Sequence, residues 1–559
     1  MKTLAIAGVC LALSLLTFFQ FPGHTWLQQD SQIYLPILEH LRDPSLLRND
    51  ILVQHPHVAF TLYDETALAL RRATGRDFHD VLASQQLATR ALGIWGLLLM
   101  AEALGLAFAP AFLVAALCSL GAAIPGPAVL TFEYEPTPRA FAVPLLLCAI
   151  GLLAHRRYLA SGIAASAAFL YHPPTALPFW GAYCVLALWP HRKHRRHREP
   201  SDHREPSEPS APNEHSEHNE HNEHRDRRER LAAFLPLAAA CLVLAAAAHA
   251  QSVPGEGQHF FARLDATQQF LEHTRTAYVW ISTWSAAAIL HHLLILAAGI
   301  LAFLRLRLAI PAGLRVFLPA LATLAVLSLP LSWLLLEHFQ WGLVPQVQPL
   351  RTLLFLTLGA QFLTAAAGAR ALLGHRPVEA FPWFAFAYLL PLQPLLTGPW
   401  ACRRAALALA LAALTALAGM RLAPAVSLAA FFAIPLLGGV VNYPRLLTPP
   451  LAELNAWART HTPRDAVFAF PAPRRSLVPG IFRGEALRAV YVDWKGGGQV
   501  NYLPSLGELW WFRWQQTRDF HPADLPRYQA MGVAFIVLPY PLGAPPAFHN
   551  STYFVYPVR

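Results

Sequence analysis

Residues 278–303 read YVWISTWSAAAILHHLLILAAGILAF and contain no Lys, Arg, Asp or Glu. About 20 apolar residues are enough for a helix to cross the hydrocarbon core of a bilayer, so this stretch predicts a membrane-spanning helix. Similar apolar blocks recur at 4–19, 91–107, 110–126, 140–154, 231–250, 316–336, 351–369, 380–397, 405–420 and 425–441. Together they predict a polytopic α-helical membrane protein with about 11–13 transmembrane helices.

The region 159–189 predicts two further, shorter segments. Tyr171-His172-Pro173-Pro174 interrupts its apolar run, and proline removes a backbone donor and breaks helices. Non-helical backbone at membrane depth is tolerated only where protein or water lines it. His172 could therefore satisfy free backbone groups, or it could line a substrate site.

The composition excludes a single soluble globule and argues against a nucleic-acid partner. Hydrophobic residues make up 55% of the chain and charged residues 14%, and the formal net charge is +10. Positive charge is typical of the cytoplasmic loops of membrane proteins, and much of it falls in such loops and in one insert. The six cysteines lie in or beside apolar blocks, so no disulfide framework is expected.

Basic residues set the expected topology. Lys2 precedes the first apolar block and no small-residue cleavage site follows it, so the block predicts an uncleaved span with a cytoplasmic N-terminus. When the spans of the core (1–441) alternate, most later basic loops fall in the cytoplasm, with Arg403-Arg404 as the exception. We therefore expect a multi-pass protein of the bacterial inner (plasma) membrane. Its first loop (20–90) and a C-terminal domain (442–559) would face the periplasm or the exterior, and its oligomeric state stays open.

Residues 191–230 form a His/Glu/Arg-rich insert that is expected to be disordered in the cytoplasm. The insert almost lacks apolar residues, so it cannot bury enough surface to fold. It carries tandem triplets such as Asn219-Glu220-His221 and Asn222-Glu223-His224. Its imidazoles could buffer zinc or nickel, although an inert, expanded loop is the simpler interpretation.

The first outer loop opens with an acidic residue at the membrane surface, Asp30. Amphipathic stretches follow it and suit helices that lie on the interface. Asp30 could act in catalysis, or it could cap the helix after it, because Asp is a preferred N-cap residue. Farther along, His55 and His57 add two imidazoles that could contact a substrate.

A second outer loop, EYEPTPR at 133–139, concentrates charge between apolar spans. Ionisable groups are costly there, which suggests a role. Glu133 and Glu135 could act in catalysis, or they could form a structural salt bridge with Arg139. Before the span at 351–369, Gln348 and Arg351 are further candidates, and the Arg351 guanidinium could clamp a phosphate.

The C-terminal segment predicts a small α/β domain. Helices are expected at 451–460, 505–516 and 523–531, and strands at 466–470, 488–493, 533–538 and 552–557. Lys495 precedes three glycines, an arrangement that could hold an anion or form a flexible turn. Trp510, Trp511 and Trp514 could stack on sugar rings, or they could pack their helix onto the sheet.

The order of these parts over residues 1–441 resembles the GT-C superfamily. Its members transfer a sugar from a polyprenyl-phosphate carrier on the outer face of the membrane, and an acidic residue of the first outer loop acts as base or metal ligand. The resemblance implies that Asp30 holds this role, with Glu133 or Glu135 as a second acidic group and Arg351 near the lipid phosphate. Many members carry paired acidic residues where Asp30 stands alone, so the need for a divalent metal is open and no metal ligand is assigned.

The segment Thr462-Pro463-Arg464-Asp465 and its surroundings resemble the tails of uncharacterised bacterial membrane proteins. The leading expectation is a glycosyltransferase-like protein of the cell envelope that uses a lipid-linked sugar donor among membrane lipids. A transporter or lipid flippase, with a pathway lined by the break at 171–174, is the main alternative. A non-catalytic assembly or sensor protein is another. The residues expected to contact substrate are His55, His57, Arg139, His172, Gln348, Arg351 and Lys495.

Overall fold

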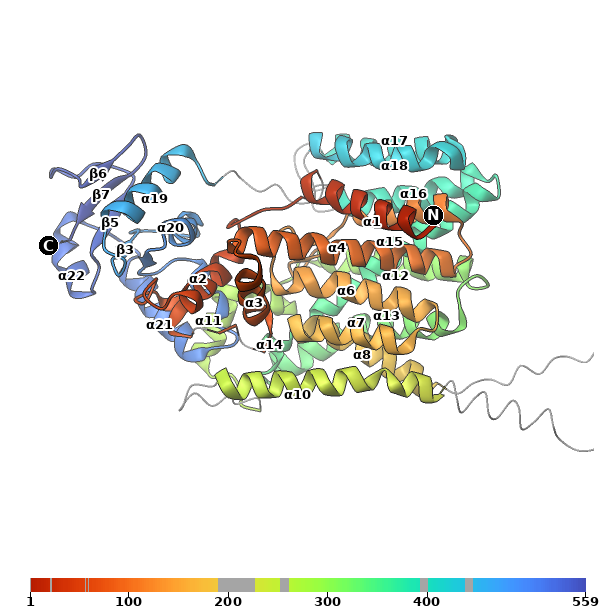
Figure 1. Ribbon diagram of the computed structural model, residues 1–559, viewed down its shortest axis with the longest axis horizontal. Coiled ribbons are helices and arrows are strands. Elements are labelled where there is room, and N and C mark those ends of the chain that lie inside the picture. Colours follow the sequence, from red (N-terminus) through yellow and green to blue (C-terminus); the bar gives the residue numbers. More distant parts are fainter. Residues whose placement is uncertain are drawn as a thin grey trace, which may run out of the picture.

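The computed structural model describes residues 2–20, 23–55, 57–58, 60–189, 227–251, 261–392, 401–437 and 446–558. Most of these residues lie in helices (Figure 1). Residues 191–226 of the predicted insert lie outside the described part of the chain.

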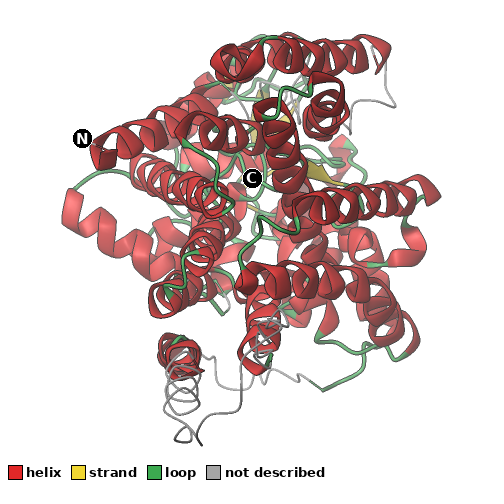
Figure 2. Cartoon of the chain, turned by 90° about the vertical axis from the view of Figure 1, so that its right-hand side faces the viewer, coloured by secondary structure: helices red, strands yellow, loops and turns green. Residues whose placement is uncertain are grey.

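Apolar helices lie side by side in one bundle (Figure 1). Figure 2 views this bundle from the end away from the C-terminal domain, and the strands lie behind the helices. The helices of the bundle are α1 (Lys2–Phe19), α4 (Phe78–Ala103), α5 (Phe108–Ser119), α6 (Pro138–Ala154), α7 (Tyr158–Tyr171), α8 (Pro173–Leu188), α10 (Phe234–Gln251), α12 (Ala286–Leu306), α13 (Ala312–Ser332), α15 (Leu353–Leu373), α16 (Pro377–Leu392), α17 (Ala401–Leu417) and α18 (Gly419–Leu436).

Helix length and composition confirm the helical membrane class. Among the described residues, five helices are long and apolar enough to cross a membrane: Arg227–Gln251, Ala286–Leu306, Ala312–His338, Val344–Leu373 and Gly419–Leu436. Shorter apolar helices at Leu4–Phe19, Phe108–Ser119, Pro138–Ala154 and Tyr158–Tyr171 accompany them. The total of about 11–13 spans stays a prediction. The apolar window of Val344–Leu373 is 94% buried, so this helix lies at the centre of the bundle.

Several predicted boundaries change. The break at 171–174 is confirmed, because α7 ends at Tyr171 and α8 begins at Pro173. The first loop ends earlier than residue 90, since Asp77 caps α4 by accepting a hydrogen bond from the Asp80 amide. The first turns of α4 are polar, so the apolar block at 91–107 did not indicate where this helix begins. The predicted span 110–126 ends as a helix at Ser119, and a hairpin of β1 (Ala123–Ile124) and β2 (Val129–Leu130) follows.

Short helices cover the end of the bundle that faces the C-terminal domain (Figure 1). They are α2 (Ser31–Arg42), α3 (Tyr63–Thr74), α11 (Ala266–Thr276) and α14 (Val344–Val347). The apolar face of α2 is buried, including Ile33, Leu35 and Leu38. It packs against the C-terminal domain rather than lying bare on a lipid surface, because these residues belong to one hydrophobic core with Phe468 and Phe482.

The C-terminal domain contains a five-stranded sheet of order β4-β3-β5-β7-β6. The strands are β3 (Val467–Ala469), β4 (Ala489–Val490), β5 (Phe535–Leu538), β6 (Phe548–His549) and β7 (Phe554–Pro557), and the helices are α19 (Pro449–His461), α20 (Val478–Ala486), α21 (Pro504–Gln516) and α22 (Leu525–Ala530). The three strands β4, β3 and β5 are parallel, and β7 and β6 continue the sheet antiparallel. These elements confirm the predicted α/β pattern.

A buried ion cluster joins the first loop to the C-terminal domain. Arg483 donates from Nε to Asp50 and from Nη2 to Asp493, both at 2.7 Å. The side chains of all three residues are fully buried. Asp50 also accepts a hydrogen bond from the Val490 amide. The first loop and the C-terminal domain therefore form one unit at this end of the bundle, which we name the outer unit for its place at the end of the helices.

Candidate active site

A cavity of about 490 Å³ lies where the bundle meets this outer unit. Its wall combines the start of α2, the first turn of α6, the break between α7 and α8, the end of α11, the segment before α15 and the loop after β4. Polar residues that line it include Asp30, Tyr34, Arg139, His172, Arg275, Gln348, Arg351, Lys495 and Tyr502. Six of the residues singled out from the sequence therefore meet in one cavity.

Asp30 is paired with a lysine of the C-terminal domain. Lys495 Nζ donates to Asp30 Oδ1 at 2.7 Å and to Gln29 Oε1 at 3.0 Å. The Asp30 side chain makes no capping hydrogen bond to α2, so the capping interpretation is wrong. Burial alone would raise the pKa of Asp30, but the charge and hydrogen bond of Lys495, together with the charges of Arg139 and Arg351, hold that pKa at about 2. Asp30 is thus a carboxylate that faces the cavity.

Glu135 holds the backbone that carries Asp30. Its Oε1 accepts from the amides of Gln28 and Gln29 at 2.6 and 2.8 Å, and its Oε2 accepts from the amide of Ser31 at 2.9 Å. Burial raises the pKa of Glu135 to about 7, although these three donors act in the opposite direction. The geometry therefore makes Glu135 a positioning residue for Asp30.

If Asp30 acts in catalysis, Glu135→Gln should lower the turnover number by about tenfold, because the amide replaces a charged acceptor that fixes residues 28–31. In the wild type, protonation of Glu135 as the pH falls below about 7 weakens the same hydrogen bonds. The acidic limb of the pH–rate profile should therefore flatten in the variant, with KM little changed. Asp80→Asn, at a half-exposed carboxylate of α4, is the matched control, and an unaltered pH profile in Glu135→Gln would contradict the role.

Glu133 forms the salt bridge that the sequence left open. Its Oε1 accepts from Arg139 Nε at 2.6 Å, and both side chains are 11% exposed. The pair lies beside a smaller hollow of about 290 Å³, which adjoins the first cavity at Asp30 and Arg139. Glu133 and Glu135 line this hollow and not the larger cavity. Asp30 therefore stands between two open spaces.

Arg351 and Arg275 line the cavity, and each has one buried donor without a partner among the described residues. Arg351 Nη1 lies 3.5 Å from His172 Nε2, while its Nε is buried without a partner among the described residues. His172 Nδ1 accepts from the Thr175 amide, so this residue also caps α8. Burial, followed by Arg351 and Arg139, holds the pKa of His172 well below its usual value, so the imidazole is neutral. Arg275 Nε is buried without a partner in the described chain as well.

Two predicted substrate contacts lie elsewhere. His55 and His57 are not among the described residues that line the cavity. His57 Nδ1 is 2.9 Å from Asp64 Oδ2. His57, Asp64 and Glu65 form a group that could hold a metal ion, since their ligand atoms lie within 4.8 Å of one another. Asp30 is not part of this group, and its nearest ionic partner is the ammonium of Lys495.

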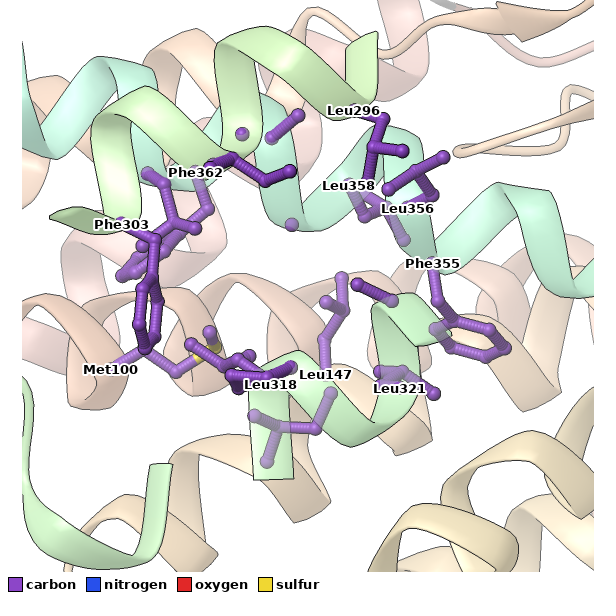
Figure 3. A pocket seen from close by; sticks show the side chains of 18 of the residues that line it. Met100, Leu147, Leu296, Phe303, Leu318, Leu321, Phe355, Leu356, Leu358 and Phe362 are labelled. Carbon is purple, nitrogen blue, oxygen red and sulfur yellow. The ribbon is translucent and has the colours of Figure 1, made fainter. Parts of the chain in front are cut away.

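Part of the lining of the large cavity is apolar. Phe169, Leu177 and Leu244 come from the bundle and belong to this part. A separate apolar cavity of about 210 Å³ lies deeper, between α4, α6, α12, α13 and α15 (Figure 3). Phe355 and Phe362 of α15 and Phe303 of α12 surround it. Its lining suits a hydrocarbon chain rather than a polar ligand.

Comparisons with known proteins cover the chain unevenly. A family model described as "Domain of unknown function (DUF6798)" matches residues 450–517, within the C-terminal domain. No curated protein matches the chain. Among solved structures, the chain is similar to the arabinofuranosyltransferase AftD from Mycobacteria, at 15% identity and a TM-score of 0.43. That match covers 98% of this chain and 36% of AftD, so the chain spans about a third of the length of AftD.

Sequence patterns did not single out Arg275, Tyr34 or Tyr502 as site residues. Arg275 lies on α11, a short amphipathic helix between two apolar blocks. Its burial beside Trp494 depends on packing between segments far apart in the chain: the guanidinium carbon is 4.1 Å from the centroid of that ring. The only local signal was an amphipathic stretch outside the predicted spans.

Proposed function

We propose that this protein is a membrane glycosyltransferase that takes a sugar from a polyprenyl-phosphate carrier on the outer face of the plasma membrane. The observation that carries the proposal is the surroundings of Asp30, whose cavity also holds Lys495, Arg139 and Arg351. Transfer of a sugar from a phosphate needs a carboxylate and cations. The carboxylate accepts the proton of the attacking hydroxyl, and the cations stabilise the anionic leaving group.

The apolar part of the cavity lining supports a lipid-linked donor. Phe169, Leu177 and Leu244 form the apolar part of the lining. A soluble nucleotide sugar would place polar groups against these side chains, which is unfavourable. An isoprenoid chain buries apolar surface by packing against these side chains, while its phosphate pairs with the cations. The smaller hollow beside Asp30 is then the space for an acceptor hydroxyl.

In the proposed reaction the acceptor hydroxyl attacks the anomeric carbon of the sugar, and the bond from that carbon to the phosphate oxygen breaks. The proton passes to Asp30, and the bonding electron pair leaves with the lipid phosphate. Lys495 and Arg351 offset the resulting negative charge. A carboxylate of pKa about 2 is a weak base. Arrival of the phosphate would draw Lys495 away from Asp30 and raise that pKa.

Ligand-induced stabilisation of the purified protein tests the donor class. A saturating polyprenyl phosphate, at a hundredfold excess over its Kd, should stabilise the folded state by about 2.7 kcal/mol. The uncharged polyprenol of equal length should stabilise it much less, and Arg351→Gln should remove most of the difference. Equal stabilisation by both lipids would contradict a phosphate site. Tight binding of the phosphate without any turnover of the sugar-bearing donor would favour the lipid flippase instead.

A further inference from the structure

A second hollow, of about 360 Å³, lies on the outer unit beside the proposed active site. Its wall contains three tryptophans and three arginines: Trp494, Trp511, Trp514, Arg474, Arg475 and Arg518. None of the described residues that line it is acidic. This combination of aromatic rings and cations is unlike an ordinary solvated surface, where large aromatic residues are few.

The helix α21 supplies the aromatic face. Trp511 and Trp514 are three residues apart and so project from the same side of the helix. Trp510, next to them, is fully buried, and its indole N–H donates to the Asp493 carbonyl at 2.8 Å. Trp510 therefore anchors the helix. In the described part of the chain, the indole N–H groups of Trp494, Trp511 and Trp514 donate no hydrogen bond, so they are free for a ligand.

The arginines supply positive charge that no described carboxylate neutralises. Arg474, Arg475 and Arg518 are exposed, and no described acidic group forms a salt bridge with any of them. Arg475 lies over the Trp494 ring, 4.9 Å from its centroid. Arg474 holds a left-handed backbone conformation with φ of 46°, which is strained for a residue with a side chain. Three like charges around one hollow are relieved by a bound anion.

Trp494 separates this hollow from the large cavity. Arg275, which lines the large cavity, lies over the same ring at 4.1 Å, and Lys495 follows Trp494 in the chain. A ligand in the hollow is thus held one side chain away from the Asp30–Lys495 pair. We infer that the hollow binds a saccharide that carries phosphate or carboxylate groups. Its sugar rings stack on the indoles and its anionic groups pair with the arginines.

The saccharide site is formed by these residues alone and does not depend on the proposed function. Binding is measured with the full-length protein in nanodiscs, using four probes. They are a sulfated dextran oligosaccharide, neutral dextran of the same length, inorganic tripolyphosphate and vesicles containing phosphatidylglycerol. The sulfated oligosaccharide should bind most tightly, because it alone offers both rings and charge.

Trp511→Ala should weaken binding of the sulfated oligosaccharide about tenfold, the loss expected for one stacking contact. Arg518→Gln, at an exposed position that cannot disturb the core, should weaken it as well. Phe512→Ala is the matched control, because Phe512 is 58% exposed on the same helix and does not line the hollow. Asp30→Asn should leave this binding unchanged, so that failure of catalysis and failure of this site are distinguishable.

Three results would overturn the inference. The first is equal binding of tripolyphosphate and the sulfated oligosaccharide with no effect of Trp511→Ala, which would mean a simple anion patch. The second is an equal loss in Phe512→Ala, which would mean a nonspecific effect on the helix. The third is vesicle binding that depends on Trp511 while the oligosaccharide does not compete, which would mean a membrane contact.

Discussion

Asp30→Asn is expected to lower the rate of sugar transfer by about a hundredfold or more, the usual contribution of a positioned general base. Asparagine keeps the shape of the side chain but cannot accept the proton of the attacking hydroxyl. The substitution also frees the ammonium of Lys495, which is 2.7 Å from the carboxylate and only 12% exposed. Binding of polyprenyl phosphate should therefore be equal to the wild type or tighter.

A lower transfer rate without weaker binding of polyprenyl phosphate would distinguish a catalytic role of Asp30 from a structural one. The rate is measured as transfer of label from a radiolabelled polyprenyl-phosphate sugar, and affinity as stabilisation by polyprenyl phosphate. Asp80→Asn, at a half-exposed carboxylate of α4, should change neither quantity. If Asp30→Asn turns over the donor as fast as the wild type, Asp30 is not the base.

Arg483→Met is expected to destabilise the outer unit by about 3–5 kcal/mol, because it leaves two buried carboxylates without their cation. Asp50 comes from the first loop, and Asp493 lies in the loop after β4, two residues before Lys495. Asp493 also accepts from the amides of Lys495 and Gly496. The loss should therefore appear as an unfolding transition at lower denaturant concentration, measured by tryptophan fluorescence. Catalysis should also fall, because Lys495 is misplaced.

A surface pair between the same two segments provides the control. Arg48 pairs with Asp465 across the first loop and the C-terminal domain, with side chains 59% and 44% exposed. Because exposed ion pairs contribute about 0–1 kcal/mol, Arg48→Gln should barely shift the transition. Similar shifts for Arg48→Gln and Arg483→Met would show that the buried cluster does not hold the outer unit together.

The sequence predicted those helices and strands that are determined by short stretches of the chain. Apolar runs such as 351–369 predicted helices of the bundle, and the pair Pro173-Pro174 predicted the break before α8. In the C-terminal domain, short runs of β-branched and aromatic residues predicted β3 and β5 near their observed positions. The block 278–303 predicted a helix too early, since the cap at Ser285 starts α12 after two short turns.

The site depended on contacts that local patterns do not contain. Lys495 is 465 residues from Asp30, and Arg483 is 433 residues from Asp50. Asp30 was singled out because it follows the first span, but the same pattern suited a capping residue. Glu135 was paired with Arg139 as one of two candidates, whereas Glu133 makes that salt bridge and Glu135 holds backbone amides. Only the fold distinguishes these roles.

The most direct test of the proposed function is donor turnover by the purified wild-type protein. A radiolabelled polyprenyl-phosphate sugar is incubated with the protein in nanodiscs and with cell-envelope glycans as acceptors, beside Asp30→Asn. The proposal predicts that label leaves the organic-soluble lipid and appears in the glycan fraction with the wild type, and stays on the lipid with the variant. Label that stays on the lipid with both proteins, or that leaves it equally fast with both, would contradict glycosyl transfer at Asp30.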